Sequence, residues 1–296
     1  MGAYDWVTTE PPRLAQLSGV EAHGDDAFAV GNRGLLLERR GGGNWDELVP
    51  GGPTGNNTNL NDVALTDDGR RLWYGGDSGA FGYYDREAEE AFPHTAPKSN
   101  TDGFRAITVR GPAGREVVHT VDDDGHVVRA TVDDETVDVT DETVPNDGAS
   151  FTAIVEYESY RYAADASGCL LRSTDGVDWQ VEQLVDTTIE GLAVAADGVA
   201  ASTDDGELFR GVSLFGETGR TGRADLGDES PEDLAAEGET FAVVGDDAAV
   251  LVVGSNGDVT RAGLNADEML HGVEIMPGGT VLAVGADGTI VEGRRT

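Results

Sequence analysis

The sequence contains very little of several residue types, and each shortage excludes a class of protein. Cys169 is the only cysteine, so neither a disulfide framework nor a cysteine-based metal site can form. No apolar run approaches the roughly 18 residues of a transmembrane helix, and the N-terminal segment lacks the charged-then-apolar pattern of a signal peptide. We therefore expect a cytoplasmic protein without membrane insertion.

Lysine is also almost absent. Lys98 is the single lysine among 20 basic residues, and 56 acidic residues give the chain a net charge of −36. The acidic residues are spread along the whole chain, and no basic stripe could replace the counterions of phosphates. Direct binding to nucleic acid is not expected.

This distributed acidity, with Ala, Gly and Val as the main apolar residues, resembles the proteins of salt-accumulating haloarchaea. Self-repulsion at such a charge destabilises a compact state in dilute buffer. In about 1 M salt the Debye length falls to about 3 Å and the repulsion is largely screened. We expect a halophilic host, either an archaeon or a virus of one.

One four-residue pattern recurs seven times: an apolar residue, a variable residue, a small or polar residue and an apolar residue. Examples are Leu17–Val20 and Leu270–Val273. A second strand, a turn that ends in glycine and a third strand follow. The turn glycines are Gly34, Gly79, Gly125, Gly168, Gly206 and Gly288, so the period is about 42 residues and the sixth copy lacks its glycine. Strand-only repeats of about 40–45 residues are typical of propeller blades.

Seven such repeats fill residues 1–296 as a single domain. The expected blades span 13–56, 57–100, 101–147, 148–185, 186–228, 229–266, and 267–296 together with 3–10. The last copy ends soon after its third strand, and Asp5–Thr9 contains a tryptophan like the outer strands of the first and fourth copies. The sequence therefore predicts an all-β, seven-bladed propeller in which the N-terminal strand completes the last blade. A β-sandwich of irregular hairpins is the less favoured alternative.

The stretches 49–59, 85–103 and 211–229 are expected to be irregular loops between blades. The last of these carries apolar residues, which we expect to be exposed as a contact patch.

The segment Gly168–Trp179 contains Ser173, Asp175, Gly176 and Trp179. It resembles an Asp-box, the Ser-x-Asp-x-Gly-x-Thr-Trp hairpin of sialidase-like repeats, although it is one residue shorter. A looser version spans 34–45. The chain therefore resembles the BNR/Asp-box-like propellers, part of the wider WD40- and YVTN-like group, which include photosystem II assembly factors and haloarchaeal proteins. The resemblance implies the fold, and it implies that Ser173 and Asp175 stabilise a turn.

The variable residues of the seven openings should point toward one end of the central channel. They are Ser18, Asn61, Arg105, Thr152, Glu190, Glu232 and His271. Sialidases use a cluster of arginines and a tyrosine nucleophile, but this set holds one arginine and no tyrosine. Adjacent blades would bring Ser18 beside His271, yet no oxyanion hole or orienting carboxylate is evident. The ring is either a polar lining of a solvated channel or a binding site for a ligand or partner, and a catalytic site is the least favoured interpretation.

The turns before the third strands are acidic, and we interpret this as halophilic surface decoration rather than as a crown of carboxylates that holds a cation. Asp122–Gly125 lacks the spacing of an EF-hand loop. The histidines His23, His94, His119 and His126 have no partner at metal-ligand spacing. No metal and no cofactor are expected.

The combined expectation is a non-enzymatic interaction scaffold or assembly platform that binds an unidentified protein partner. The alternative is a head that binds a glycan or another small ligand at the channel mouth, on a virion or a cell surface. A glycosidase-like enzyme is the weakest of the three.

Overall fold

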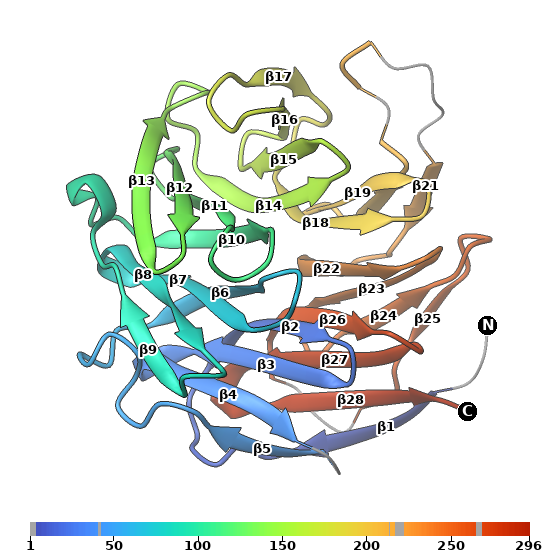
Figure 1. Ribbon diagram of the computed structural model, residues 1–296. Coiled ribbons are helices and arrows are strands. Elements are labelled where there is room, and N and C mark those ends of the chain that lie inside the picture. Colours follow the sequence, from blue (N-terminus) through green and yellow to red (C-terminus); the bar gives the residue numbers. More distant parts are fainter. Residues whose placement is uncertain (1–3, 41–42, 213, 217–221, 265–267) are drawn as a thin grey trace.

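Seven four-stranded antiparallel sheets surround a central channel in the computed structural model, which describes residues 4–40, 43–212, 214–216, 222–264 and 268–296 (Figure 1). The predicted all-β, seven-bladed propeller is confirmed. None of the helices in the described ranges is long and apolar enough to cross a membrane.

The blades follow one another in chain order, and each inner strand lies beside the channel. The inner strands are β2 (Leu17–His23), β6 (Leu60–Leu65), β10 (Phe104–Arg110), β14 (Phe151–Tyr157), β18 (Ile189–Ala195), β22 (Pro231–Glu237) and β26 (Leu270–Met276), of blades 1 to 7. The second strands are β3 (Asp26–Gly31), β7 (Arg71–Gly76), β11 (Val117–Asp122), β15 (Tyr160–Asp165), β19 (Gly198–Thr203), β23 (Thr240–Gly245) and β27 (Thr280–Gly285).

The third and outer strands complete each sheet. The third strands are β4 (Leu35–Arg40), β8 (Ala80–Asp85), β12 (Val127–Asp133), β16 (Cys169–Ser173), β20 (Glu207–Arg210), β24 (Val250–Val253) and β28 (Ile290–Arg295). The outer strands are β5 (Asn44–Glu47), β9 (Glu90–Pro93), β13 (Thr136–Thr143), β17 (Gln180–Gln183), β21 (Gly222–Asp225), β25 (Val259–Arg261) and, for blade 7, β1 (Tyr4–Thr9).

The N-terminal strand closes the ring as predicted. β1 pairs antiparallel with β28, from Tyr4 opposite Arg295 to Thr9 opposite Ile290 (Figure 1). A Cβ atom placed on Gly293 would lie 2.3 Å from the Trp6 ring, so the indole packs directly on the backbone of β28. Both ends of the described chain therefore meet in one sheet, and no radial seam is left open.

The turns between second and third strands fall into two classes. In blades 1, 2, 6 and 7 the second strand ends in glycine, because a Cβ there would overlap the start of the inner strand; at Gly31 it would lie 2.0 Å from the Gln16 carbonyl oxygen. In blades 3, 4 and 5 a polar side chain occupies this position and accepts backbone N–H groups of its own turn. Asp165, for example, accepts from Ser167 and Cys169.

The missing glycine of the sixth repeat has a backbone explanation. Ala248 adopts a φ of 51° there, the left-handed region that Gly34, Gly79 and Gly288 occupy in the matching turns. Such a conformation costs a non-glycine residue about 1 kcal/mol. The turn geometry is therefore kept although the sequence signal is lost.

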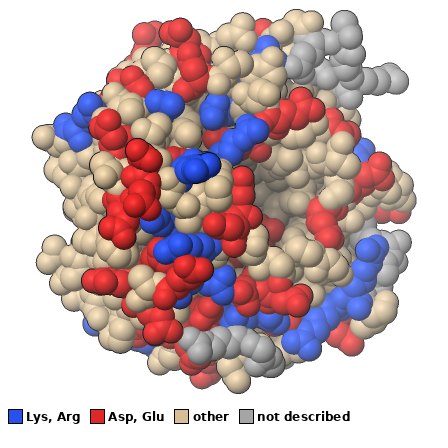
Figure 2. All heavy atoms as spheres, viewed as in Figure 1, with Lys and Arg blue, Asp and Glu red and all other residues tan. Residues whose placement is uncertain are grey.

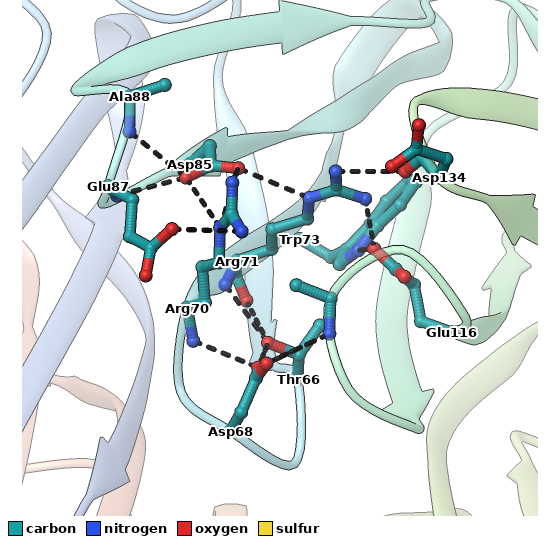
Figure 3. A network of polar contacts seen from close by, with 11 residues as sticks. Thr66, Asp68, Arg70, Arg71, Trp73, Asp85, Glu87, Ala88, Glu116 and Asp134 are labelled. Carbon is teal, nitrogen blue, oxygen red and sulfur yellow. Dashed lines mark hydrogen bonds and ion pairs between the residues drawn. The ribbon is translucent and has the colours of Figure 1, made fainter.

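The hydrophobic core is divided among the seven seams between blades, with one apolar cluster at each seam. The seam between blades 2 and 3 also holds a buried polar network (Figure 3). Arg71 donates to Glu116 over 2.8 Å and to the Asp134 carbonyl oxygen over 3.0 Å. Each blade is thus held by contacts with both of its neighbours.

Two expectations about loops are wrong. The stretch 85–103 contains the outer strand β9, and the described part of 211–229 contains β21; residues 213 and 217–221 lie outside the described residues. Val212, Leu214 and Phe215 do not form an exposed patch; they pack on the apolar cluster between blades 4 and 5. The Phe215 ring lies 4.4 Å from the Arg172 guanidinium carbon, so this segment fastens blade 5 to blade 4.

Candidate functional site at the channel mouth

A β-bulge begins every inner strand, and it sits at the variable residue of the repeat. The pairing register of each inner strand with its second strand shifts between the first and third residues of the opening. A bulged residue leaves the ladder, and its side chain is re-aimed. All seven bulged residues line one cavity of about 520 Å³ in the channel. We call the face on which they lie the ring face, and its members are Ser18, Asn61, Arg105, Thr152, Glu190, Glu232 and His271.

Three ring residues are engaged in holding the scaffold. The Asn61 side-chain amide donates to the Phe104 carbonyl oxygen over 2.9 Å, and the Thr152 hydroxyl donates to that of Ile189 over 2.6 Å. Each bond connects one blade with the next. Arg105 forms an ion pair with Asp123 over 3.0 Å on its own blade.

The remaining four ring residues lie on the contiguous blades 5, 6, 7 and 1. His271 Nδ1 lies 3.6 Å from Glu232 Oε2, and no hydrogen bond joins His271 to Ser18 among the described residues. Glu190 and Glu232 form no ion pair with a lysine or arginine of the described chain. Burial, together with the neighbouring carboxylates of Glu232 and Asp204, raises the pKa of Glu190 to about 7. This side of the mouth therefore gathers carboxyl groups that form no ion pair with a lysine or arginine of the described residues.

Four further carboxyl groups line the same cavity, on blades 6, 7, 1 and 2. Asp62 accepts the Ile107 N–H over 2.9 Å, and Asp233 accepts the Val273 N–H over 2.8 Å, so each connects its blade with the next. Burial raises the pKa of both to about 7. Glu21 and Glu274 lie on adjacent blades, and no lysine or arginine of the described residues pairs with either of them.

Burial and the nearby Asp62 and Asp233 raise the pKa of Glu21 to about 8. Burial and Glu21 also raise that of Glu274 well above its ordinary value. The repeat pattern does not mark these residues, because acidic residues two or four positions after its first residue look like ordinary variation. Only the ring closure brings blades 6, 7, 1 and 2 together.

The acidic turns also lie on the ring face, but they are not uniform decoration. Asp122 and Asp165 are fully buried and organise their own turns. Asp77 accepts from the side-chain amides of Asn59 and Asn61. Asp246 and Asp247 are exposed. Figure 2 shows acidic side chains spread over the visible face, with basic ones in smaller groups among them.

One group of possible metal ligands was missed in the sequence. His126 Nδ1 lies 3.0 Å from Asp122 Oδ2, and Asp102 is close to both. The pair Asp122 and His126 is visible as an i, i+4 spacing around a turn, but Asp102 precedes β10 and reaches the turn only through the folding of blade 3.

The Asp-box prediction is confirmed at the level of local structure. The Ser173 hydroxyl donates to Asp175 Oδ1 over 3.0 Å and accepts the Gly176 N–H over 2.8 Å. Asp175 Oδ1 in turn accepts the N–H groups of Val177 and Asp178. These contacts stabilise the turn and involve no residue of the channel mouth.

Comparison with known proteins gives no family by sequence. No protein-family model matches the chain, and no curated protein matches it. Solved structures match over nearly the whole length. Virginiamycin B lyase from Staphylococcus aureus has a TM-score of 0.82 at 12% identity, covering 99% of this chain and 100% of that one. This similarity establishes the fold alone.

Two further propellers match with somewhat lower TM-scores. Ycf48 from Cyanidioschyzon merolae has a TM-score of 0.77 at 14% identity, with 98% of each chain covered. The WD40 repeats of RRP9 give a TM-score of 0.76 at 11% identity, covering 100% of this chain and 99% of that one. The neighbours thus include a protein named as a lyase and a protein named for its WD40 repeats.

Proposed function

We propose that this protein is a non-enzymatic interaction platform that presents its ring face to a protein partner in a salt-rich cytoplasm. The observation that carries the proposal is the convergence of seven bulged side chains on one polar cavity of a closed ring. The backbone positions of such a site are set by rigid sheets, which favours a preorganised binding surface.

The chemistry of the partner follows from the charges at the mouth. Glu190 and Glu232 repel one another and have no arginine or lysine partner among the described residues, so a cationic side chain placed between them would be stabilised. In molar salt, exposed charges are screened within about 3 Å, whereas a partly buried contact pair is screened much less. Glu190 and Glu232 at the channel mouth would therefore contribute to the choice of partner, whereas carboxylates outside the contact with the partner would not.

The test is affinity purification of the full chain from its native host in molar salt. The variant Glu190→Gln with Glu232→Gln is compared with Asp246→Asn and Asp247→Asn, which remove the same charge from the same face away from the channel. A stoichiometric protein should co-purify with the wild type and the control, and its recovery should fall at least tenfold with the mouth variant. Equal recovery with all three proteins, or no stoichiometric partner, would overturn the proposal.

A small polar ligand in the channel is the second candidate, because the cavity of about 520 Å³ continues below the mouth to Asp233 and Glu274. A glycan or small-ligand screen by thermal shift on the purified protein tests it. A hit that is lost with Asp233→Asn, but not with Asp246→Asn, would favour this candidate over the platform.

A further inference from the structure

Three side chains with metal-ligating atoms gather on the ring face of blade 3. Asp102 precedes β10, Asp122 ends β11, and His126 lies in the turn that leads to β12. One ligand atom from each can be chosen so that all three atoms lie within 4.8 Å of one another. No other group of this kind occurs in the described parts of the chain.

The separations suit a common metal ion. His126 Nδ1 lies 3.0 Å from Asp122 Oδ2 and 3.9 Å from Asp102 Oδ2. Nitrogen and oxygen ligands bound at about 2.0–2.1 Å lie roughly 3 Å apart around the metal. Only a small movement of the Asp102 side chain would bring the third ligand atom into range.

The surrounding residues orient two of the three groups. Asp122 is fully buried, and its Oδ1 accepts the N–H groups of Asp124 and His126. Its Oδ2 accepts from the Asn100 side-chain amide over 2.8 Å, and Asn100 Oδ1 accepts the Asp102 N–H over 2.8 Å. Asn100 thus hydrogen-bonds to both Asp122 and Asp102 without being a ligand itself. Residues that orient metal ligands in this way are usual in metal sites.

The electrostatics also favour a cation. The nearby guanidinium of Arg105 is engaged by Asp123. The side chains of His126 and Asp102 remain 27% and 37% exposed, which leaves a path from solvent.

We propose that Asp102, Asp122 and His126 form a binding site for one divalent transition-metal ion of the zinc class. The metal takes the place of the Nδ1 proton that His126 shares with Asp122, and the imidazole then carries its proton on Nε2. An imidazole ligand distinguishes this site from acidic decoration, because imidazole suits zinc, copper or nickel, whereas magnesium and calcium prefer oxygen ligands. The bound ion would stiffen the turn that holds Asp123 against Arg105.

The experiment is a calorimetric titration of the full chain with zinc chloride in potassium chloride solution, with the electronic absorption of added cobalt(II) as a second readout. We expect one equivalent of zinc to bind, and a cobalt spectrum that indicates a nitrogen ligand. His126→Gln and Asp102→Asn should each weaken zinc binding at least tenfold. Asp122 is left unchanged because it organises the turn.

Two controls separate the site from the acidic surface. Asp246→Asn with Asp247→Asn should bind zinc as the wild type does, and magnesium chloride should not compete at equal concentration. Zinc affinity that is unchanged by His126→Gln, or lowered equally by the Asp246 and Asp247 changes, would overturn the proposal. Circular dichroism of each variant confirms that the fold is retained.

Discussion

Arg71 of blade 2 donates a hydrogen bond to Glu116 of blade 3 over 2.8 Å, and the two side chains are 4% and 0% exposed (Figure 3). Arg71 also lies 3.4 Å from Asp85 and stacks over the Tyr83 ring at 4.4 Å. A buried ion pair of this kind is costly to break, because the remaining charge loses its partner in a poorly hydrated place.

Replacing Glu116 by alanine should lower the free energy of unfolding by about 3 kcal/mol, because the Arg71 guanidinium would stay buried with less compensation. Denaturant unfolding in molar salt measures this. Glu207→Ala is the matched control, since it removes an exposed pair with Arg223 and should cost less than about 1 kcal/mol. Equal effects of the two changes would show that the seam pair has no special role.

The contact between Trp6 and Gly293 makes the ring closure testable. Gly293→Ala should destabilise the protein by about 1–3 kcal/mol, because its Cβ would overlap the indole. Trp6→Ala removes the indole, so in that background the same Gly293→Ala change should cost much less. A double-mutant cycle without coupling would mean that β1 does not pack on β28 as described.

The channel carboxylates predict an unusual dependence of stability on pH. Because the folded-state pKa of Glu21 is raised from 4.5 to about 8, the folded protein binds protons more tightly than the unfolded chain. The contribution of Glu21 to the free energy of unfolding is complete below about pH 4, and it is lost as the pH rises through about 8. Thermal midpoints measured in molar salt should therefore fall between about pH 5 and about pH 8.5.

Glu21→Gln should flatten this pH dependence, since an uncharged amide replaces the carboxyl group. Asp246→Asn, at an exposed turn, is the control and should leave the slope as it is. If Glu21→Gln leaves the slope unchanged as well, the channel carboxylates do not titrate as a group.

The net charge of −36 predicts a strong dependence on salt. The thermal midpoint should rise as potassium chloride is increased from about 0.2 M to about 2 M, because the Debye length shortens and the self-repulsion is screened. Sucrose stabilises proteins because it is excluded from their surface, and it does not screen charge. The thermal midpoint should therefore rise less with sucrose than with potassium chloride. A midpoint independent of salt would argue against adaptation to a salt-rich cytoplasm.

Much of the fold could be predicted because its signals are local and repeat along the chain. The four-residue openings, the turn glycines and the tryptophan of the first strand each reflect a backbone requirement within one blade. The ring residues could be predicted for the same reason, since a bulge occurs at the same position of every repeat. The sixth turn escaped the glycine pattern because Ala248 adopts the left-handed geometry that a glycine adopts in the matching turns.

The candidate site could be predicted only in part. The seven residues at the channel mouth could be predicted, but not that Asn61 and Thr152 are hydrogen-bonded to carbonyl groups of the following blades. The group of Asp102, Asp122 and His126 was also missed. It depends on a segment before an inner strand meeting a turn about 20 residues later, and no residue pattern marks that meeting.

The sequence by itself determined the number of blades, the closing strand and the ring of bulged residues, because each depends on short-range backbone geometry repeated about every 42 residues. The tertiary structure alone decided the Arg71–Glu116 pair at a seam and the convergence of Glu21 with Glu274 from the first and last blades. The physical reason is that charge and burial depend on neighbours in space, and ring closure makes neighbours of residues about 250 positions apart.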